Sequence, residues 1–264
     1  MRIALGVEYD GSAFRGWQTQ HDARTVQECL EQALSRVADH PVRVQCAGRT
    51  DAGVHATGQV VHFDTQAVRR ERSWVLGANV NLPDDINLMW ARPVPAEFNA
   101  RYSATARCYR YEIFNRSARS ALLRNRVVWH HQPLDEQRMH RSGQELLGEH
   151  DFSSYRAQGC QARSPIRRVS RLSVRRQGER VILEIMANAF LHHMVRNIAG
   201  VLMAIGRGDR PETWAADVLA LRDRALGGVT APPQGLYLVG VEYPSEFGIP
   251  DWREGADAAM GLTS

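Results

Sequence analysis

The chain has 264 residues, a formal net charge of +4 and four scattered cysteines, and all 33 of its basic residues are arginine. Without lysine, Schiff-base, pyridoxal and P-loop chemistry are excluded, and without a CxxC pair neither a disulfide framework nor a structural zinc site is expected. The N-terminus lacks an apolar signal region and no stretch approaches ~20 apolar residues, so a cytoplasmic protein without a membrane span is expected.

The first hundred residues predict an α+β arrangement. Alternating apolar residues predict a strand over residues 2–9. Thr25 and Glu28 have capping-box spacing, and the apolar residues that follow share one side of a helix. The elements predicted after this helix are strands at 42–47 and 57–64, a helix near 69–79 and an extended segment over 86–94.

The run AGRTDAGVHA, residues 47–56, is predicted to connect two of these strands. It places the carboxylate of Asp51 two residues after the guanidinium of Arg49. Gly48 and Gly53 bracket the pair and allow positive φ or close approach to a ligand. An ordinary turn, in which Asp51 bonds its own backbone, is the alternative interpretation of a lone Asp-x-Gly. Ten specific residues in a row favour a chemical site.

The chemistry open to Asp51 follows from its ionisation. An aspartate with its ordinary pKa of about 3.9 is already charged at neutral pH, so a nucleophile or a base is an easier role than a general acid. Retaining glycosidases use such a carboxylate to attack a sugar carbon, but they pair it with a second carboxyl group. No second acid accompanies Asp51 in its motif.

The second half of the chain repeats the order of elements. The sequence predicts a strand over 107–114, a helix over 134–147, two hairpin strands at 166–176 and 180–187, and an apolar helix over 189–206. The boundary between the halves is expected near 103–107. The Gly-, Asp- and Ala-rich tail after Pro244 is expected to be loosely ordered.

Positive charge is concentrated in the middle of the chain, where residues 101–182 carry 17 arginines against 7 acidic residues. Arginines pair with phosphates and aromatic rings stack on bases, so this composition favours a structured RNA as partner. A solvated surface is the alternative. The aromatic residues interleaved with the arginines are Tyr102, Tyr109, Tyr111, Trp129 and Tyr155.

The predicted helix over 189–206 carries Arg196 among apolar residues that cover most of its circumference, so it is expected to be largely buried. A buried guanidinium without an anion is costly, and we therefore expect a carboxylate partner, which a purely structural ion pair would also provide. His192 and His193 are adjacent rather than four residues apart on this helix, so no metal site is predicted.

Five further segments accompany GRTDAGVH of the loop over 47–56: VEYDGSAFRGWQ (7–18), ATARCYRYEIFN (104–115), GEHDFSSYR (148–156), NAFLHHMVRNIAG (188–200) and GLYLVGVEYP (235–244). Together, and in this order, these motifs resemble those of the tRNA pseudouridine synthase A family. The family's Phe-His-Ala-Arg is Phe98-Asn99-Ala100-Arg101 here, a departure that concerns a backbone or RNA contact rather than the chemistry.

The resemblance implies an α+β pseudouridine synthase fold of two ferredoxin-like halves, residues 1–104 and 105–264, whose sheets join across a central basic cleft. It implies Asp51 as the catalytic carboxylate and Arg196 as the charge that holds it ionised and aimed. Tyr109, in a strand where a tyrosine is most often core, would stack on the target base. Arg49 would enter the duplex and hold a flipped nucleotide out.

The resemblance further implies a homodimer that converts uridine to pseudouridine at positions 38, 39 and 40 of the tRNA anticodon stem and loop without a cofactor. Uracil stays bound, turns and reattaches through C5, so one carboxylate suffices. Three roles for Asp51 remain open: attack on C1′, addition to the base, or removal of a sugar proton. The competing functions are a non-catalytic tRNA-binding module and a nucleoside hydrolase or glycosidase.

Overall fold

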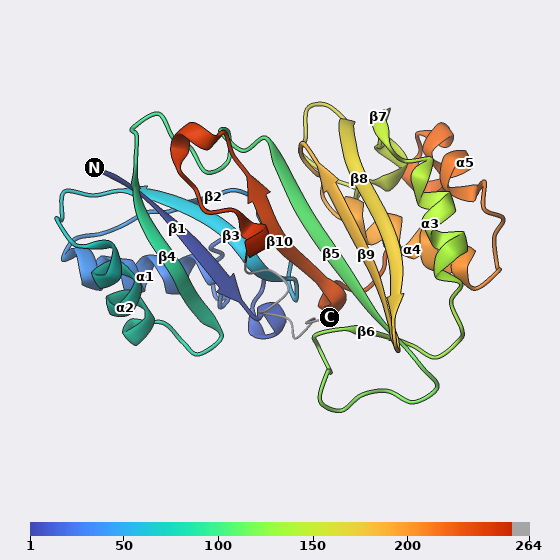
Figure 1. Cartoon of the computed structure of the whole chain (residues 1–264), viewed down its shortest axis with the longest axis horizontal. Coiled ribbons are helices and arrows are strands. Elements are labelled where there is room, and N and C mark those ends of the chain that lie inside the picture. Colours follow the sequence, from blue (N-terminus) through green and yellow to red (C-terminus); the bar gives the residue numbers. More distant parts are fainter. Residues whose placement is uncertain (255–264) are drawn as a thin grey trace. The chain divides into compact units, whose positions relative to one another are not determined.

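The chain, seen here in a computed structural model that describes residues 1–254, folds into two compact units. The first comprises Met1–Arg107 and the C-terminal segment from Tyr237, and the second comprises Cys108–Leu236. The described residues form a mixed α/β fold with ten strands, mostly antiparallel, and five α-helices (Figure 1). The division into ferredoxin-like halves at 1–104 and 105–264 stays a prediction.

The first unit contains four strands in the order β4-β1-β3-β10, with the short β2 beside β3. Strand β1 pairs antiparallel with β3 and β4, whereas β10 pairs parallel with β3 through Tyr237 and His55. The elements are β1 (Arg2–Tyr9), α1 (Val26–Ala38), β2 (Gln45–Cys46), β3 (His55–Asp64), α2 (Glu71–Asn81), β4 (Ile86–Val94) and β10 (Leu236–Glu242).

The core of this unit lies between the strands and the pair of helices α1 and α2, which Figure 1 shows side by side. Strand β1 is buried over most of its length and lies between β3 and β4 in the sheet. Trp74 of α2 packs edge-on against Phe63 of β3, with ring centroids 5.2 Å apart. Burial of such aromatic side chains is a main source of stability.

The second unit has the strand order β5-β9-β8-β7, with β6 parallel to β5, and β8 and β9 form an antiparallel hairpin. Helices α3, α4 and α5 pack against one another, and α3 also contacts β8. The elements are β5 (Ala106–Asn115), β6 (Val128–His130), α3 (Glu136–Gln144), β7 (Gly148–Asp151), β8 (Ile166–Gln177), β9 (Arg180–Ala187), α4 (Met194–Gly206) and α5 (Trp214–Leu221).

The structure confirms the predicted strand over residues 2–9, the extended segment over 86–94 and the hairpin. The predicted strand over 42–47 is wrong in its length, since only β2 pairs there. The backbone N–H groups of Val42 and Val44 donate instead to Ser35 Oγ at 2.9 Å and Glu31 Oε1 at 3.0 Å in α1. Thr25 precedes α1 at the N-cap, but its side chain makes no capping hydrogen bond.

The predicted helix over 189–206 begins later than expected. Its first helical residue is Met194, because His193 adopts a left-handed conformation with φ 61° and ψ 5°. His192 and His193 therefore precede α4 rather than lie on it. The helix expected over 134–147 is likewise shorter, and β6, β7, β10 and α5 were not predicted.

The remaining described elements are short 3-10 turns, and none of the helices in residues 1–254 is long and apolar enough to cross a membrane. The tail expected to be loose is partly structured: Ser245–Phe247 and Trp252–Glu254 form 3-10 turns, and residues 255–264 lie outside the described part. The other turns are Gly11–Ala13, Ser153–Tyr155, Arg224–Leu226 and Pro233–Gly235.

Candidate active site

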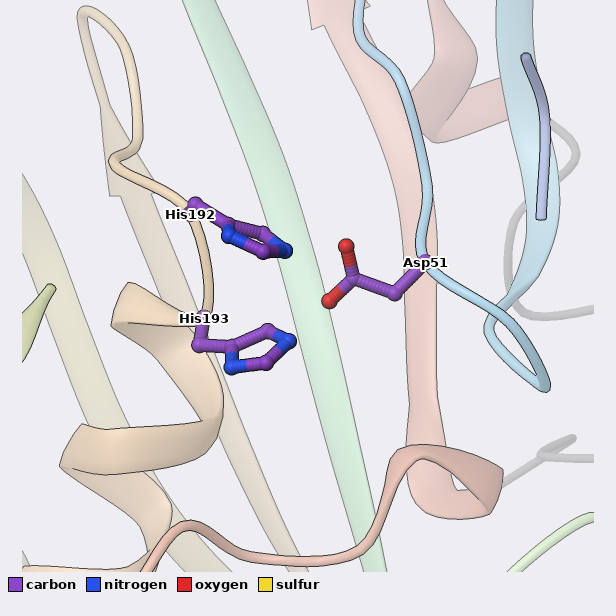
Figure 2. Close-up of side chains that lie close together, drawn as sticks. All are labelled: Asp51, His192 and His193. Atoms are coloured by element: carbon purple, nitrogen blue, oxygen red, sulfur yellow. The ribbon is translucent and has the colours of Figure 1, made fainter. Parts of the chain in front are cut away.

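Asp51 lies on the loop between β2 and β3, and its half-exposed side chain extends from that loop (Figure 2). Strand β3 holds the start of the loop. The side-chain amide of the buried Gln59 donates to Gly48 O at 2.6 Å and accepts from Gly48 N at 3.4 Å, and Ala47 N donates to Val60 O at 2.8 Å. Two residues of β3 thus fix the backbone that leads to Asp51.

Thr50, directly before Asp51, is buried and held from the N-terminal segment. Trp17 N donates to Thr50 O at 3.0 Å, and the Thr50 hydroxyl lies 2.7 Å from the hydroxyl of Tyr9. Because both the carbonyl and the side chain of Thr50 are engaged, the peptide that carries Asp51 has little rotational freedom. The first motif of the sequence, residues 7–18, therefore supports the aspartate loop.

A tight turn follows the aspartate. Val54 N donates to Asp51 O at 3.1 Å, and Gly53 has φ 75° at the third position of this turn. A positive φ at that position strongly favours glycine. Gly16 backs the loop: a Cβ there would lie 2.8 Å from Thr50 O and 3.1 Å from Ala52 N. Only glycine permits this approach without a shift of the loop.

The end of the loop is also fixed. His55, the first residue of β3, is buried, accepts from Gly11 N at 3.1 Å through Nδ1, and stacks on Tyr237 of β10 with ring centroids 4.6 Å apart. At the other end, burial raises the pKa of the Cys46 thiol to about 12, so this residue is a neutral neighbour of the site. The loop is therefore held at both ends by groups that are not predicted site residues.

Arg49 is exposed and lies two residues from Asp51. Arg107 serves a different purpose, because its buried guanidinium donates to Ala47 O at 3.1 Å through Nη2 and to Ala104 O at 3.2 Å through Nη1. Arg107 thus anchors the start of the loop, whereas the side chain of Arg49 is exposed to solvent.

In the second unit, Arg196 lies on the first turn of α4 and is half-buried, whereas the helix around it is largely buried as expected. Arg196 Nε donates to Ala231 O at 2.8 Å, and Ala231 N donates to Arg196 O at 3.1 Å. The segment over 229–231 runs close to the helix: a Cβ on Gly200 would lie 1.8 Å from Val229 O.

Asn197 fixes this part of the second unit. Its buried side chain donates to Tyr155 O at 2.7 Å through Nδ2, and its Oδ1 accepts from Thr230 Oγ1 at 2.6 Å and Arg224 Nη2 at 3.2 Å. A buried amide with partners on both of its atoms strongly defines local geometry. Asn197 therefore sets the position of the segment that carries Ala231.

Tyr109 is 8 % exposed on β5, and its ring packs edge-on against Phe190 with centroids 5.0 Å apart. Tyr111, two residues on and on the same face of the strand, is fully buried and donates to Pro232 O at 2.9 Å. Burial raises the pKa of the Tyr111 phenol. Strand β5 therefore supports the segment that orients Arg196.

His192 and His193 lie next to each other before α4, with ring centroids 4.0 Å apart (Figure 2). Imidazoles and the Asp51 carboxylate are side chains of the kinds that ligate metal ions. The absence of a metal site, expected from the sequence, stays a prediction.

The four predicted site residues are divided between the units: Asp51 and Arg49 share one loop of the first, and Arg196 and Tyr109 belong to the second. The pairing of Asp51 with Arg196 stays a prediction. Sequence reasoning missed the residues that hold the backbone, above all Gln59 and Asn197. For Asn197 the available signal was a polar residue inside a largely apolar helix, whereas β3 contains several polar residues and gave no such signal for Gln59.

Comparison with known proteins adds independent evidence. A family profile described as tRNA pseudouridine synthase matches residues 6–103 and 143–244. The chain belongs to this family, a class of isomerases that convert uridine to pseudouridine. A solved chain in a crystal structure of a Cbf5-Nop10-Gar1 complex, at 11% identity over 76% of this chain and 54% of that one, has a TM-score of only 0.33 and defines no shared fold.

Three relatives named tRNA pseudouridine synthase A are similar over most of their length. The protein of Methylococcus capsulatus is 65% identical over 94% of this chain and 92% of its own. That of Nitrosococcus oceani is 61% identical over 95% and 96%. That of Aeromonas hydrophila is 57% identical over 100% of both chains. The resemblance in the motifs thus extends to the whole sequence.

Proposed function

We propose that this chain isomerises uridine to pseudouridine in tRNA, at positions 38, 39 and 40 of the anticodon stem and loop. Membership of the tRNA pseudouridine synthase family and the shared name of relatives at 57–65% identity support the reaction and the substrate class. The choice of positions rests on the resemblance of the motifs. The single observation that carries the proposal is the fixed loop of Asp51.

The reaction is balanced without an external oxidant or reductant. The N1–C1′ bond of uridine breaks, uracil turns within the site, and a C5–C1′ bond forms. The C5 proton leaves for water, and N1 gains a proton. Asp51 attacks C1′, adds to the base or removes a sugar proton; each role needs an ionised carboxylate held in one direction.

The loop geometry suits this demand. Both ends of the Asp51 loop, and Thr50 directly before Asp51, are fixed by hydrogen bonds from β3 and from the N-terminal segment. Preorganisation of a reacting group on a rigid support lowers the entropic part of the barrier. Asp51 is half-exposed, so the carboxylate is accessible to a nucleotide.

The second unit supplies the remaining proposed groups. Arg196 pairs with Asp51 and keeps it ionised, because a guanidinium beside a carboxylate favours its charged form. Tyr109 stacks on the target base, and its hydroxyl assists proton movement. Arg49 enters the helical stem in place of the extruded uridine, whose removal costs a few kcal/mol.

The quaternary and cellular setting follows from the same resemblance. The two halves join their sheets across a basic cleft, two copies of the chain form a homodimer, and the enzyme works in the cytoplasm. A stem longer than one cleft would then be gripped across two subunits. Seventeen arginines against seven acidic residues in 101–182 support the basic character of the cleft.

The test uses tRNA labelled with tritium at uridine C5 and follows both the label and the free base. An isomerase releases tritium to water and no uracil. A nucleoside hydrolase or glycosidase releases uracil, and a non-catalytic RNA-binding module releases neither. Release of uracil would refute the proposed reaction. So would tRNA that keeps all of its tritium after incubation with folded protein.

A further inference from the structure

The connection between β5 and β6 in the second unit, the long green loop beside β6 in Figure 1, has an unusual composition. The stretch over residues 113–134 contains four arginines and no acidic residue. The family profile matches residues 6–103 and 143–244, so the stretch lies between the two matched segments. Neither the catalytic loop nor α4 includes any of it.

The loop is ordered although it protrudes. Leu123 N donates to Ser120 Oγ at 3.1 Å, Arg126 N donates to Leu123 O at 3.0 Å, and Asn125 takes a positive φ of 64°. At its base, Arg116 Nε donates to Ala118 O at 2.7 Å and its guanidinium lies 4.5 Å over the ring of Phe114. The loop therefore presents its side chains from a defined backbone.

The side chains it presents are basic and apolar. Arg119 and Arg124 are exposed, and within residues 1–254 neither is paired with a carboxylate. Leu122, between them, is 93 % exposed, and the nearby Trp129 of β6 is 43 % exposed, with its indole N–H bonded to Arg116 O at 3.0 Å. A cluster of unpaired guanidinium groups around exposed apolar side chains fits a partner with phosphates and exposed bases or sugars.

We propose that this loop, residues 117–126, is a second contact surface for tRNA, which binds the phosphate backbone outside the nucleotide that is isomerised. The proposal rests on the proposed function, because it takes tRNA as the substrate. Arg119 and Arg124 bond to phosphate oxygens, and Leu122 packs on a sugar or base beside them. The loop contributes to binding and takes no part in the chemistry.

The test compares the wild type with Arg119→Ala/Arg124→Ala and with Leu122→Ser. Because each lost phosphate contact lowers the slope of log K against log salt by roughly 0.7 to 0.9, the double variant should lower it by about 1.4 to 1.8. KM for full-length tRNA should rise in both variants while kcat at saturating tRNA is unchanged. The charge-matched control is Arg69→Ala/Arg72→Ala, two exposed residues of which Arg69 precedes α2 and Arg72 lies in its first turn.

An unchanged salt slope and KM in the loop variants, with an active wild type, would overturn the loop proposal and leave the proposed function intact. An equal effect in the control would also overturn it, since the loss would then follow from net charge alone. A wild type that releases no tritium from labelled tRNA would instead refute the proposed function. Far-ultraviolet circular dichroism and the melting temperature of each variant verify that the protein folds.

Discussion

Arg196 and Ala231 exchange two hydrogen bonds: Ala231 N donates to Arg196 O at 3.1 Å, and Arg196 Nε donates to Ala231 O at 2.8 Å. The backbone and the side chain of the arginine are thus held by one residue of a neighbouring segment. Orientation of Arg196 therefore depends on how closely the segment over 229–231 approaches α4.

Gly200→Ala should disturb that approach. The new Cβ would lie 1.8 Å from Val229 O, so the segment must move and Arg196 must turn with it. We expect a loss of about 1–3 kcal/mol in the free energy of unfolding, as for other overpacked sites, and a clear fall in kcat. Denaturant unfolding and tritium release measure the two effects.

The matched control for this substitution is Ala204→Gly, one turn further along α4 and half-buried. It should cost about 0.5–1 kcal/mol of stability through backbone entropy while activity is kept. If kcat falls in Gly200→Ala and Ala204→Gly in proportion to their loss of unfolding free energy, the close approach at Gly200 does not orient Arg196.

A double-mutant cycle tests whether Asp51 and Arg196 interact. Arg196→Met should leave the Asp51 carboxylate without its counter-charge and without the group that aims it, so turnover should fall. Asp51→Asn combined with Arg196→Met should be more stable than the sum of the single effects predicts, because neither charge is left alone.

Unfolding free energies of the wild type, the two single variants and the double variant provide the data, and tritium release measures turnover. Strict additivity of the unfolding free energies, together with wild-type turnover in Arg196→Met, would show that the two residues do not meet.

The exposed arginines that precede and begin β8 give a prediction about RNA binding. Arg163 and Arg168 are exposed, and Arg168 Nε lies at a long distance of 3.7 Å from a carboxylate oxygen of Glu149. Joint replacement of Arg163 and Arg168 by Ala should weaken tRNA binding. It should also reduce the slope of log K against log salt by roughly 0.7 to 0.9 per lost phosphate contact. Filter binding across a salt series measures the slope, and a slope equal to that of the wild type would place the RNA elsewhere.

Arg167, between Arg163 and Arg168 in the sequence, is expected to behave differently because its side chain is bonded to the protein. Its Nη1 donates to Ser164 O at 2.9 Å and Ile166 O at 2.6 Å, and burial lowers its pKa. Arg167→Ala should therefore alter local stability more than the salt slope.

The lowered pKa of His62 leads to a prediction of how the free energy of unfolding varies with pH. Burial, together with the positive charge of Arg2, lowers the pKa of His62 below its usual 6.5, and its Nδ1 accepts from Ala100 N at 3.1 Å. The unfolded chain then binds a proton more readily than the folded one. The contribution to stability is complete above pH 6.5 and is lost as pH falls from there through the lowered pKa.

His62→Gln should therefore reduce the fall in unfolding free energy between about pH 7 and pH 5. His130, whose pKa burial also lowers, acts in the same sense, so part of the fall remains. His21→Gln, at an exposed position, is the control. An unaltered pH dependence in His62→Gln would contradict the assignment.

The sequence predicted the elements and motifs that are continuous along the chain. The loop of Asp51 was recognisable because its ten residues are adjacent, and β1 and the hairpin follow from simple alternation. The residues that hold this loop in place were not recognisable from the sequence, because Gln59 and Trp17 contact it from other parts of the chain.

Two errors have a local physical cause. Phe190 and Leu191 fit the apolar pattern of the helix, yet α4 begins only at Met194 because His193 takes a left-handed conformation that periodicity does not reveal. The alternation around Val42 and Val44 suggested a longer strand, but their N–H groups are used by side chains of α1. In both cases a nonlocal or conformational constraint overrides the local pattern.

The most direct test of the central claim is position-resolved mapping of pseudouridine in unmodified tRNA treated with wild-type protein and with Asp51→Asn. We expect pseudouridine at positions 38, 39 and 40 with the wild type, and none with the variant although it still binds the tRNA. Pseudouridine confined to other positions, or turnover retained by Asp51→Asn free of wild-type enzyme, would contradict the account.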